Sequence, residues 1–99
     1  MRNTDIMPEV LQAVPGEDFT VYAYMNDGAV RLVDMKPLIE RGNLFAKLKN
    51  IDFFNSVTVM NNTVAWDLSG VRDPYNCIDI DPCNIEECPI VADPLEKRA

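Results

Sequence analysis

The sequence predicts an α+β protein with a small, mainly antiparallel, twisted β-sheet and two or three short helices. Three observations predict this class: strand-like stretches joined by tight turns, short helical stretches between them, and a length of 99 residues, which suits one core. We therefore expect a single domain over residues 1–99. Its ordered core is expected to span about residues 7–90, with flexible tails at 1–6 and 93–99.

The N-terminal third predicts three strands. Residues 9–14 form the first, and residues 19–25 alternate between two faces. One face carries Phe19, Val21, Ala23 and Met25, and the other carries Thr20, Tyr22 and Tyr24. Residues 29–34 are expected to pair with 19–25, because Asn-Asp-Gly at 26–28 suits a type I′ hairpin turn, whose residues need positive φ.

Two short helices are predicted after this hairpin, at 37–42 and 51–55. The first begins with a proline and ends at a glycine, an order that is typical of helix starts and stops. The second is preceded by Asn50, whose side chain can cap the free N–H groups at a helix start. Such short helices need a sheet to pack against.

The C-terminal half predicts a second hairpin over 57–66, with its turn at the two asparagines, and a short strand around 78–80. Asp81 is then expected to cap a helix that runs from Pro82 to about Cys88. We expect this helix to cover, through Ile85, the face of the first sheet that carries the tyrosines.

The net charge of −7 is unevenly distributed. Residues 67–93 contain seven acidic residues and one basic residue, Arg72, whereas residues 1–66 contain eight acidic and six basic residues. An acidic surface repels phosphate, which argues against direct nucleic-acid binding. No apolar run is long enough to span a membrane, and the first residues do not resemble a secretory signal, so we expect a cytoplasmic protein.

Catalytic machinery is not apparent in the sequence. There is no histidine, which removes the commonest general base and the usual nucleophile pairs. The two serines, Ser56 and Ser69, lie outside any nucleophile motif, and the glycines are too dispersed to form a phosphate-binding loop. We therefore predict that the protein is not an enzyme and needs no cofactor.

Three cysteines, Cys77, Cys83 and Cys88, lie close together in the sequence. They lack the paired spacing of a zinc site, and their odd number does not suit a disulfide framework. We expect them to pack against the core or along a helix face, because free cysteine is commonly buried. Calcium or magnesium binding by Asp79 and Asp81 is a weaker alternative.

An ordered series of short motifs resembles a small bacterial family catalogued as domain of unknown function 2442. The matching residues are Pro8-Glu9-Val10, Ala13, Asn26 to Arg31, Asp34, Pro37-Leu38-Ile39, Gly42, Leu48-Lys49-Asn50, Phe53-Phe54, Val57, Val59, Val64, Trp66 and Ile80-Asp81-Pro82. The resemblance implies a small α+β fold with a twisted antiparallel sheet, and it supplies no catalytic residues. It also implies, for some relatives, a neighbouring gene that suggests toxin–antitoxin pairing. This chain departs from the usual family pattern in one place, an enlarged loop at 67–76 between the tryptophan and the Asp-Pro helix start.

Two functional hypotheses follow from these observations. We favour a protein–protein interaction module, antitoxin-like or regulatory, that binds a basic protein encoded nearby or a second copy of itself. The alternative is a small-ligand or metal-binding domain that uses the acidic segment 67–81 and nearby aromatic residues. The candidate surface comprises Tyr22, Tyr24, Asp67, Asp73, Tyr75, Asp79, Glu86 and Glu87.

Overall fold

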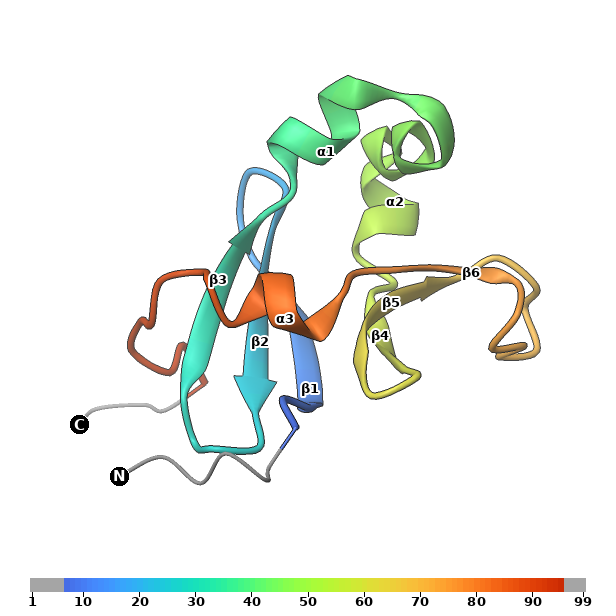
Figure 1. Ribbon diagram of the computed structural model, residues 1–99. Helices are drawn as coiled ribbons and strands as arrows, with labels where there is room; N and C mark the ends of the chain where they lie inside the picture. The colour runs from blue at the N-terminus through green and yellow to red at the C-terminus, as the bar shows by residue number, and fades with distance from the viewer. Residues whose placement is uncertain (1–6, 96–99) are drawn as a thin grey trace.

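The computed structural model describes residues 7–95, which form two three-stranded antiparallel sheets and several short helices (Figure 1). The first sheet comprises β1 (Val10–Pro15), β2 (Thr20–Met25) and β3 (Val30–Asp34), and the second comprises β4 (Thr58–Met60), β5 (Thr63–Asp67) and β6 (Cys77–Asp79). The helices are α1 (Lys36–Arg41), α2 (Ile51–Phe54), α3 (Pro82–Ile85) and the 3-10 helix η1 (Asn43–Lys49). The predicted α+β class is confirmed, with the strands divided between two sheets.

The first hairpin forms as predicted, but its turn is of a different type. Met25 N donates to Ala29 O (2.9 Å) and Gly28 N donates to Met25 O (3.1 Å), and within the turn only Gly28 has a positive φ, of 91°. This is a three-residue loop that ends in a left-handed glycine. Type I′ geometry, with two successive positive φ values, occurs instead at Asn61 and Asn62 in the second hairpin (φ 56° and 64°).

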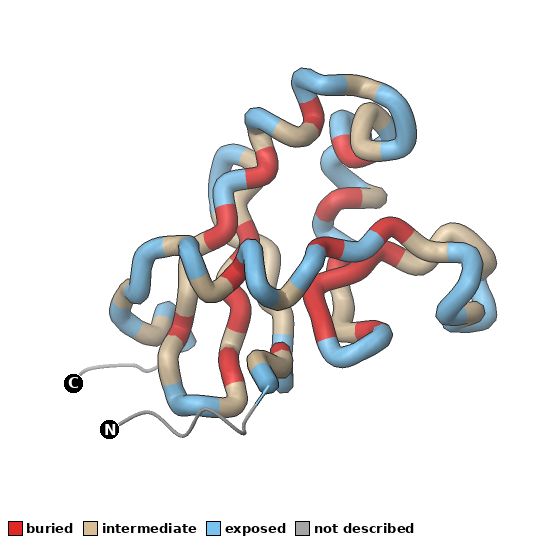
Figure 2. Tube along the Cα trace, in the orientation of Figure 1, coloured by how far each residue is buried: buried red, intermediate tan, exposed pale blue. Residues whose placement is uncertain are grey.

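The core lies between the two sheets and the helices (Figure 2). The alternation predicted for β2 is confirmed, since Val21, Ala23 and Met25 are at most 4% exposed. Trp66 of β5 is fully buried, and its Nε1 donates to the carbonyl of Phe54 (2.8 Å). A backbone bond from Val10 N to the Asn62 carbonyl (2.9 Å) also joins the two sheets.

The predicted helix caps are present. The Asn50 side chain accepts hydrogen bonds from Asp52 N and Phe53 N at the start of α2. Asp81 accepts one from Cys83 N at the start of α3, which ends at Ile85 and continues only as turns to Cys88. The 3-10 helix η1, which no cap residue marks in the sequence, places Leu48 in the core.

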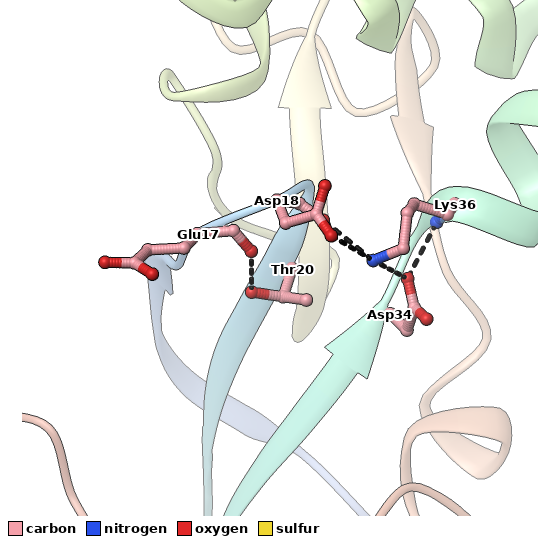
Figure 3. A network of polar contacts seen from close by, with 5 residues as sticks. All are labelled: Glu17, Asp18, Thr20, Asp34 and Lys36. Carbon is pink, nitrogen blue, oxygen red and sulfur yellow. Dashed lines mark hydrogen bonds and ion pairs between the residues drawn. The ribbon is translucent and has the colours of Figure 1, made fainter.

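A polar network fixes the loop between β1 and β2 to the start of α1 (Figure 3). Lys36 Nζ contacts Asp34 Oδ1 (3.0 Å) and Asp18 Oδ2 (3.3 Å), and it donates to the Asp18 carbonyl (2.9 Å). Asp18 and Phe19 both have positive φ, which is unfavourable for an aromatic residue. The edge-to-face contact between Phe19 and Phe54, with ring centroids 5.2 Å apart, helps to hold this conformation.

The chain after α3 runs along the outer edge of β3. Leu32 N donates to Pro89 O (3.0 Å) and Val91 N donates to Val30 O (2.8 Å). Tyr24 Oη then donates to Asp93 Oδ1 (2.5 Å), so this stretch is anchored to the first sheet. Of the tails predicted at 1–6 and 93–99, residues 1–6 and 96–99 lie outside the described residues.

Candidate interaction surface

The loop between β5 and β6 is organised by one carboxylate. Asp67 Oδ1 accepts hydrogen bonds from Ser69 N (2.9 Å) and Ser69 Oγ (2.7 Å), while Oδ2 accepts one from Arg72 N (2.7 Å). The bond from the Ser69 hydroxyl is the main cause that holds the pKa of Asp67 below its usual range. Asp67 therefore acts as an internal brace of the loop rather than as an unoccupied acidic contact.

Further hydrogen bonds fix the rest of this loop. Ser69 Oγ accepts from Val71 N and Asp73 N (both 3.1 Å), and Asp73 Oδ1 accepts from Tyr75 N (3.0 Å). Leu68 N donates to the Asn76 carbonyl (3.2 Å) across the base of the loop. The loop is thus held by its own side chains although it contains no regular secondary structure.

The same loop is fastened to the second sheet. Arg72 donates through Nη1 to Thr58 Oγ1 (3.2 Å) and through Nη2 to the Val59 carbonyl (2.7 Å). From the β4–β5 turn, Asn61 Nδ2 donates to the Pro74 carbonyl (3.2 Å). The only base between residues 67 and 93 therefore donates to two uncharged acceptors of β4.

Two apolar side chains project from this loop. Tyr75 is 97% exposed and Val71 is 80% exposed, the highest values among the large hydrophobic residues that the structure describes. Asp79 of β6 is exposed nearby in the sequence, and Asp73 is half-buried. We call Val71, Asp73, Tyr75 and Asp79 the loop surface. All of them were predicted from the sequence except Val71, which no motif marks.

The two other tyrosines lie elsewhere. Tyr22 and Tyr24 are half-buried on the face of the first sheet opposite Val21 and Ala23. Ile85 was expected to cover that face, but it is fully buried in the core cluster that contains Val21 and Ala23, so this expectation was wrong. The cause is that the stretch after α3, rather than α3 itself, passes around β3 and brings Asp93 to Tyr24.

Tyr22 lines a shallow depression on this face. The depression is bounded by Pro15, Gly16, Glu17, Asp18, Thr20, Tyr22 and Leu32. The hydroxyl of Tyr24 donates a hydrogen bond to Asp93. Burial together with this bond raises the pKa of Tyr24 to about 12. The tyrosine pair predicted as part of one surface is therefore separated from the loop surface by the fold.

The acidic residues of the C-terminal third divide into two groups. Burial raises the pKa of the Cys77 thiol, and three nearby carboxylates raise it further; these belong to Asp79, Asp67 and Asp73. The pKa of Cys83 is raised chiefly by Asp81, with smaller effects from Glu86 and Glu87. Glu86 and Glu87 thus accompany α3, while the other predicted acids accompany the loop and β6.

The cysteines are unpaired, and they differ in environment. Cys88 is half-buried against the core, as predicted for all three, but Cys83 is exposed and Cys77 is half-buried beside the loop. Burial also raises the pKa of Cys88. Raised thiol pKa values disfavour the nucleophilic thiolate. Within residues 7–95 no three cysteine or carboxylate side chains are placed to hold a metal ion.

The fold defines the class of the protein, and comparison with known proteins defines its family. The chain is a small α+β protein of two antiparallel sheets with a braced loop. Residues 10–87 match the family described as Protein of unknown function (DUF2442), and the chain belongs to that family. No curated protein and no solved structure gave a match. None of the helices described is long and apolar enough to cross a membrane.

Proposed function

We propose that the protein is a protein–protein interaction module that binds a basic partner through the loop surface. The observation that carries this proposal is the 97% exposure of Tyr75 on a loop whose backbone is fixed by the Asp67 and Asp73 carboxylates. Exposed aromatic side chains on rigid supports are typical anchors of protein interfaces. A braced loop loses little conformational entropy when it binds, because its backbone is already ordered.

The charge of this region specifies the partner. Asp73 accepts a bond from the Tyr75 N–H, and Asn61 Nδ2 joins the Pro74 carbonyl to the Asp79 carboxylate, so both acids place negative charge near Tyr75. A basic surface would be attracted to this charge, and an arginine could stack on the tyrosine ring. Such an interaction weakens with salt, because exposed charges are screened.

The most specific form of the proposal is an antitoxin-like role, in which the acidic surface neutralises a small basic partner. A cytoplasmic location belongs to this proposal, and the three unpaired cysteines support it because they suit a reducing compartment. No observation favours the alternative of a metal or small-ligand site in 67–81, where the carboxylates mainly brace the loop.

Affinity capture from the native host with salt as a variable tests this proposal. The wild-type protein and a Tyr75→Ala/Asp73→Lys variant are immobilised in parallel, and Glu40→Lys, an exposed acid on α1, serves as a charge-matched control. We expect one stoichiometric basic protein at about 50 mM salt, retained by the control and lost by the variant. Recovery of no stoichiometric partner at either about 50 or about 500 mM salt would refute the proposal.

A further inference from the structure

Four outer strands, β1, β3, β4 and β6, border the two sheets within residues 7–95. Unpaired strand edges invite other strands to add, so native proteins usually block them. The edge of β3 is occupied, because Leu32 N and Val30 O bond to the segment 89–91. The edge of β4 is also occupied, because the Val59 carbonyl accepts a bond from Arg72.

The edge of β1 is blocked by other means. The pairing with β2 shifts register between Val10 and Gln12, which marks a bulge, and Val10 N bonds to the Asn62 carbonyl. At its other end β1 finishes in Pro15, which has no N–H to offer. Bulges and prolines are common protections of edge strands.

The edge of β6 is different. Leu68 N bonds to Asn76 O and Ile80 N bonds to Val64 O, and Trp66 is paired with Ile78 midway between these bonds. Because hydrogen-bonded pairs alternate in an antiparallel ladder, the backbone groups of Cys77 and Asp79 point away from β5. No backbone group of these two residues has a hydrogen-bond partner in the part of the chain that the structure describes.

We propose that this open edge of β6 receives an extended segment of the basic partner, which adds as a further strand beside Cys77–Asp79. This inference rests on the proposed function and names its mode of recognition. Strand addition supplies main-chain hydrogen bonds for affinity, while neighbouring side chains supply specificity. Tyr75 lies two positions before β6 and provides the apolar anchor where the added strand would end.

The negative charge at the edge of β6 favours a basic strand over a second copy of the same chain as the binding partner. Two β6 edges paired with each other would bring together two copies of Asp79, with Asp73 and Asp81 close along the chain. Like charges placed opposite each other destabilise strand pairs, and opposite charges stabilise them. The carboxylates therefore disfavour self-association at this edge and favour a strand that carries lysine or arginine.

Amide hydrogen exchange followed by NMR tests the mode of binding. The probe is a synthetic peptide about nine residues long that alternates lysine with valine and threonine, and the matched probe has the same sequence N-methylated at every amide, which blocks both of its edges. We expect the first probe to slow exchange of the Cys77 and Asp79 amides about tenfold at saturation. The Ile78 amide, which faces β5, serves as the internal reference, and the N-methylated probe is expected to protect neither edge amide.

Two variants separate strand pairing from charge. Asp79→Pro removes an outward N–H, whereas Asp79→Asn keeps it and removes only the charge. We expect at least tenfold weaker binding of the unmodified peptide by the first variant and a smaller loss by the second. A proline variant that fails to fold leaves the comparison of the two peptides on the wild-type protein as the deciding measurement.

The outcomes distinguish this inference from the proposed function. Equal binding of both peptides would overturn strand addition and leave a basic-partner module in place. Absence of binding by either peptide, with a basic partner still captured from the host, would also overturn strand addition alone. Absence of both peptide binding and a captured partner would overturn the two proposals together.

Discussion

Replacement of Trp66 by phenylalanine tests the centre of the core. The indole is fully buried, its Nε1 donates to the Phe54 carbonyl (2.8 Å), and its ring centroid lies 5.5 Å from that of Phe54. Trp66→Phe removes the hydrogen bond and part of the ring while it keeps an aromatic group in place. The change therefore probes the contact between β5 and α2 directly.

The expected destabilisation is the sum of two effects. Loss of the hydrogen bond contributes about 1 kcal/mol, near the typical net value, because the Phe54 carbonyl keeps a bond from Val57 N (3.2 Å). The space left by the smaller ring contributes about 1–2 kcal/mol. The total of about 2–3 kcal/mol is a large share of the roughly 5–15 kcal/mol available to a small domain.

Urea unfolding followed by far-UV circular dichroism measures this loss, because the variant has no tryptophan fluorescence. Tyr75→Phe is the matched control, since it removes one polar atom from an exposed aromatic ring and is expected to change stability by less than about 0.5 kcal/mol. A destabilisation below about 1 kcal/mol for Trp66→Phe would refute the reasoning, because neither the hydrogen bond nor the packing would then contribute as inferred.

Three further predictions follow from the local geometry. A Cβ at Gly16 would lie 2.5 Å from Thr20 Oγ1, so we expect Gly16→Ala to lower the free energy of unfolding in urea by about 1–3 kcal/mol. The additional change Thr20→Ala should restore part of this loss, and an unchanged free energy of unfolding in Gly16→Ala would contradict the close contact. Burial and the bond to Asp93 raise the pKa of Tyr24 to about 12, above the value of about 10 in the unfolded chain. The neutral phenol therefore stabilises the folded state below pH 10, and this contribution to the free energy of unfolding is lost as the pH rises toward 12. Asp93→Ala should bring this ionisation closer to pH 10 in an ultraviolet absorbance titration, and an unmoved titration would show that the bond has no influence. The cysteines should be alkylated by iodoacetamide near neutral pH more slowly than free cysteine, because each thiol pKa is raised, and an equal rate would argue against the inferred environments.

Local elements of the fold could be predicted because their causes are local. The first hairpin depends on alternation in β2 and on a glycine that accepts positive φ, and both are visible in the sequence. The caps at Asn50 and Asp81 act on N–H groups a few residues away, so neighbouring residues suffice to infer them. The family could likewise be inferred, because its motifs extend along most of the chain.

Features that depend on distant contacts could not be predicted. The three-residue loop of the first hairpin was not predicted, because the turn-forming residues at 26–28 suit more than one loop length and the pairing of β2 with β3 decides between them. The division into two sheets depends on which strands meet across the chain, and the two sheets join at the bulged end of β1, where Val10 N bonds to the Asn62 carbonyl. For the candidate site, the acidic residues and Tyr75 could be identified from the sequence. The bracing role of Asp67 could not, because it depends on the positions that Ser69 and Arg72 take in the folded loop.

Arg72 links the charge of the candidate site to the state of the sheet edges. Its guanidinium reaches the Val59 carbonyl and Thr58, so it covers β4. It is also the only base in 67–93, where seven acidic residues outnumber it. Arg72 therefore covers the edge of β4, whereas in the proposed mode of recognition the surplus of acids at the open edge of β6 disfavours a second acidic copy and favours a basic strand. Alanine at position 72 would remove both bonds, so the loop would lose this anchor to the second sheet and the Val59 carbonyl would lose its donor.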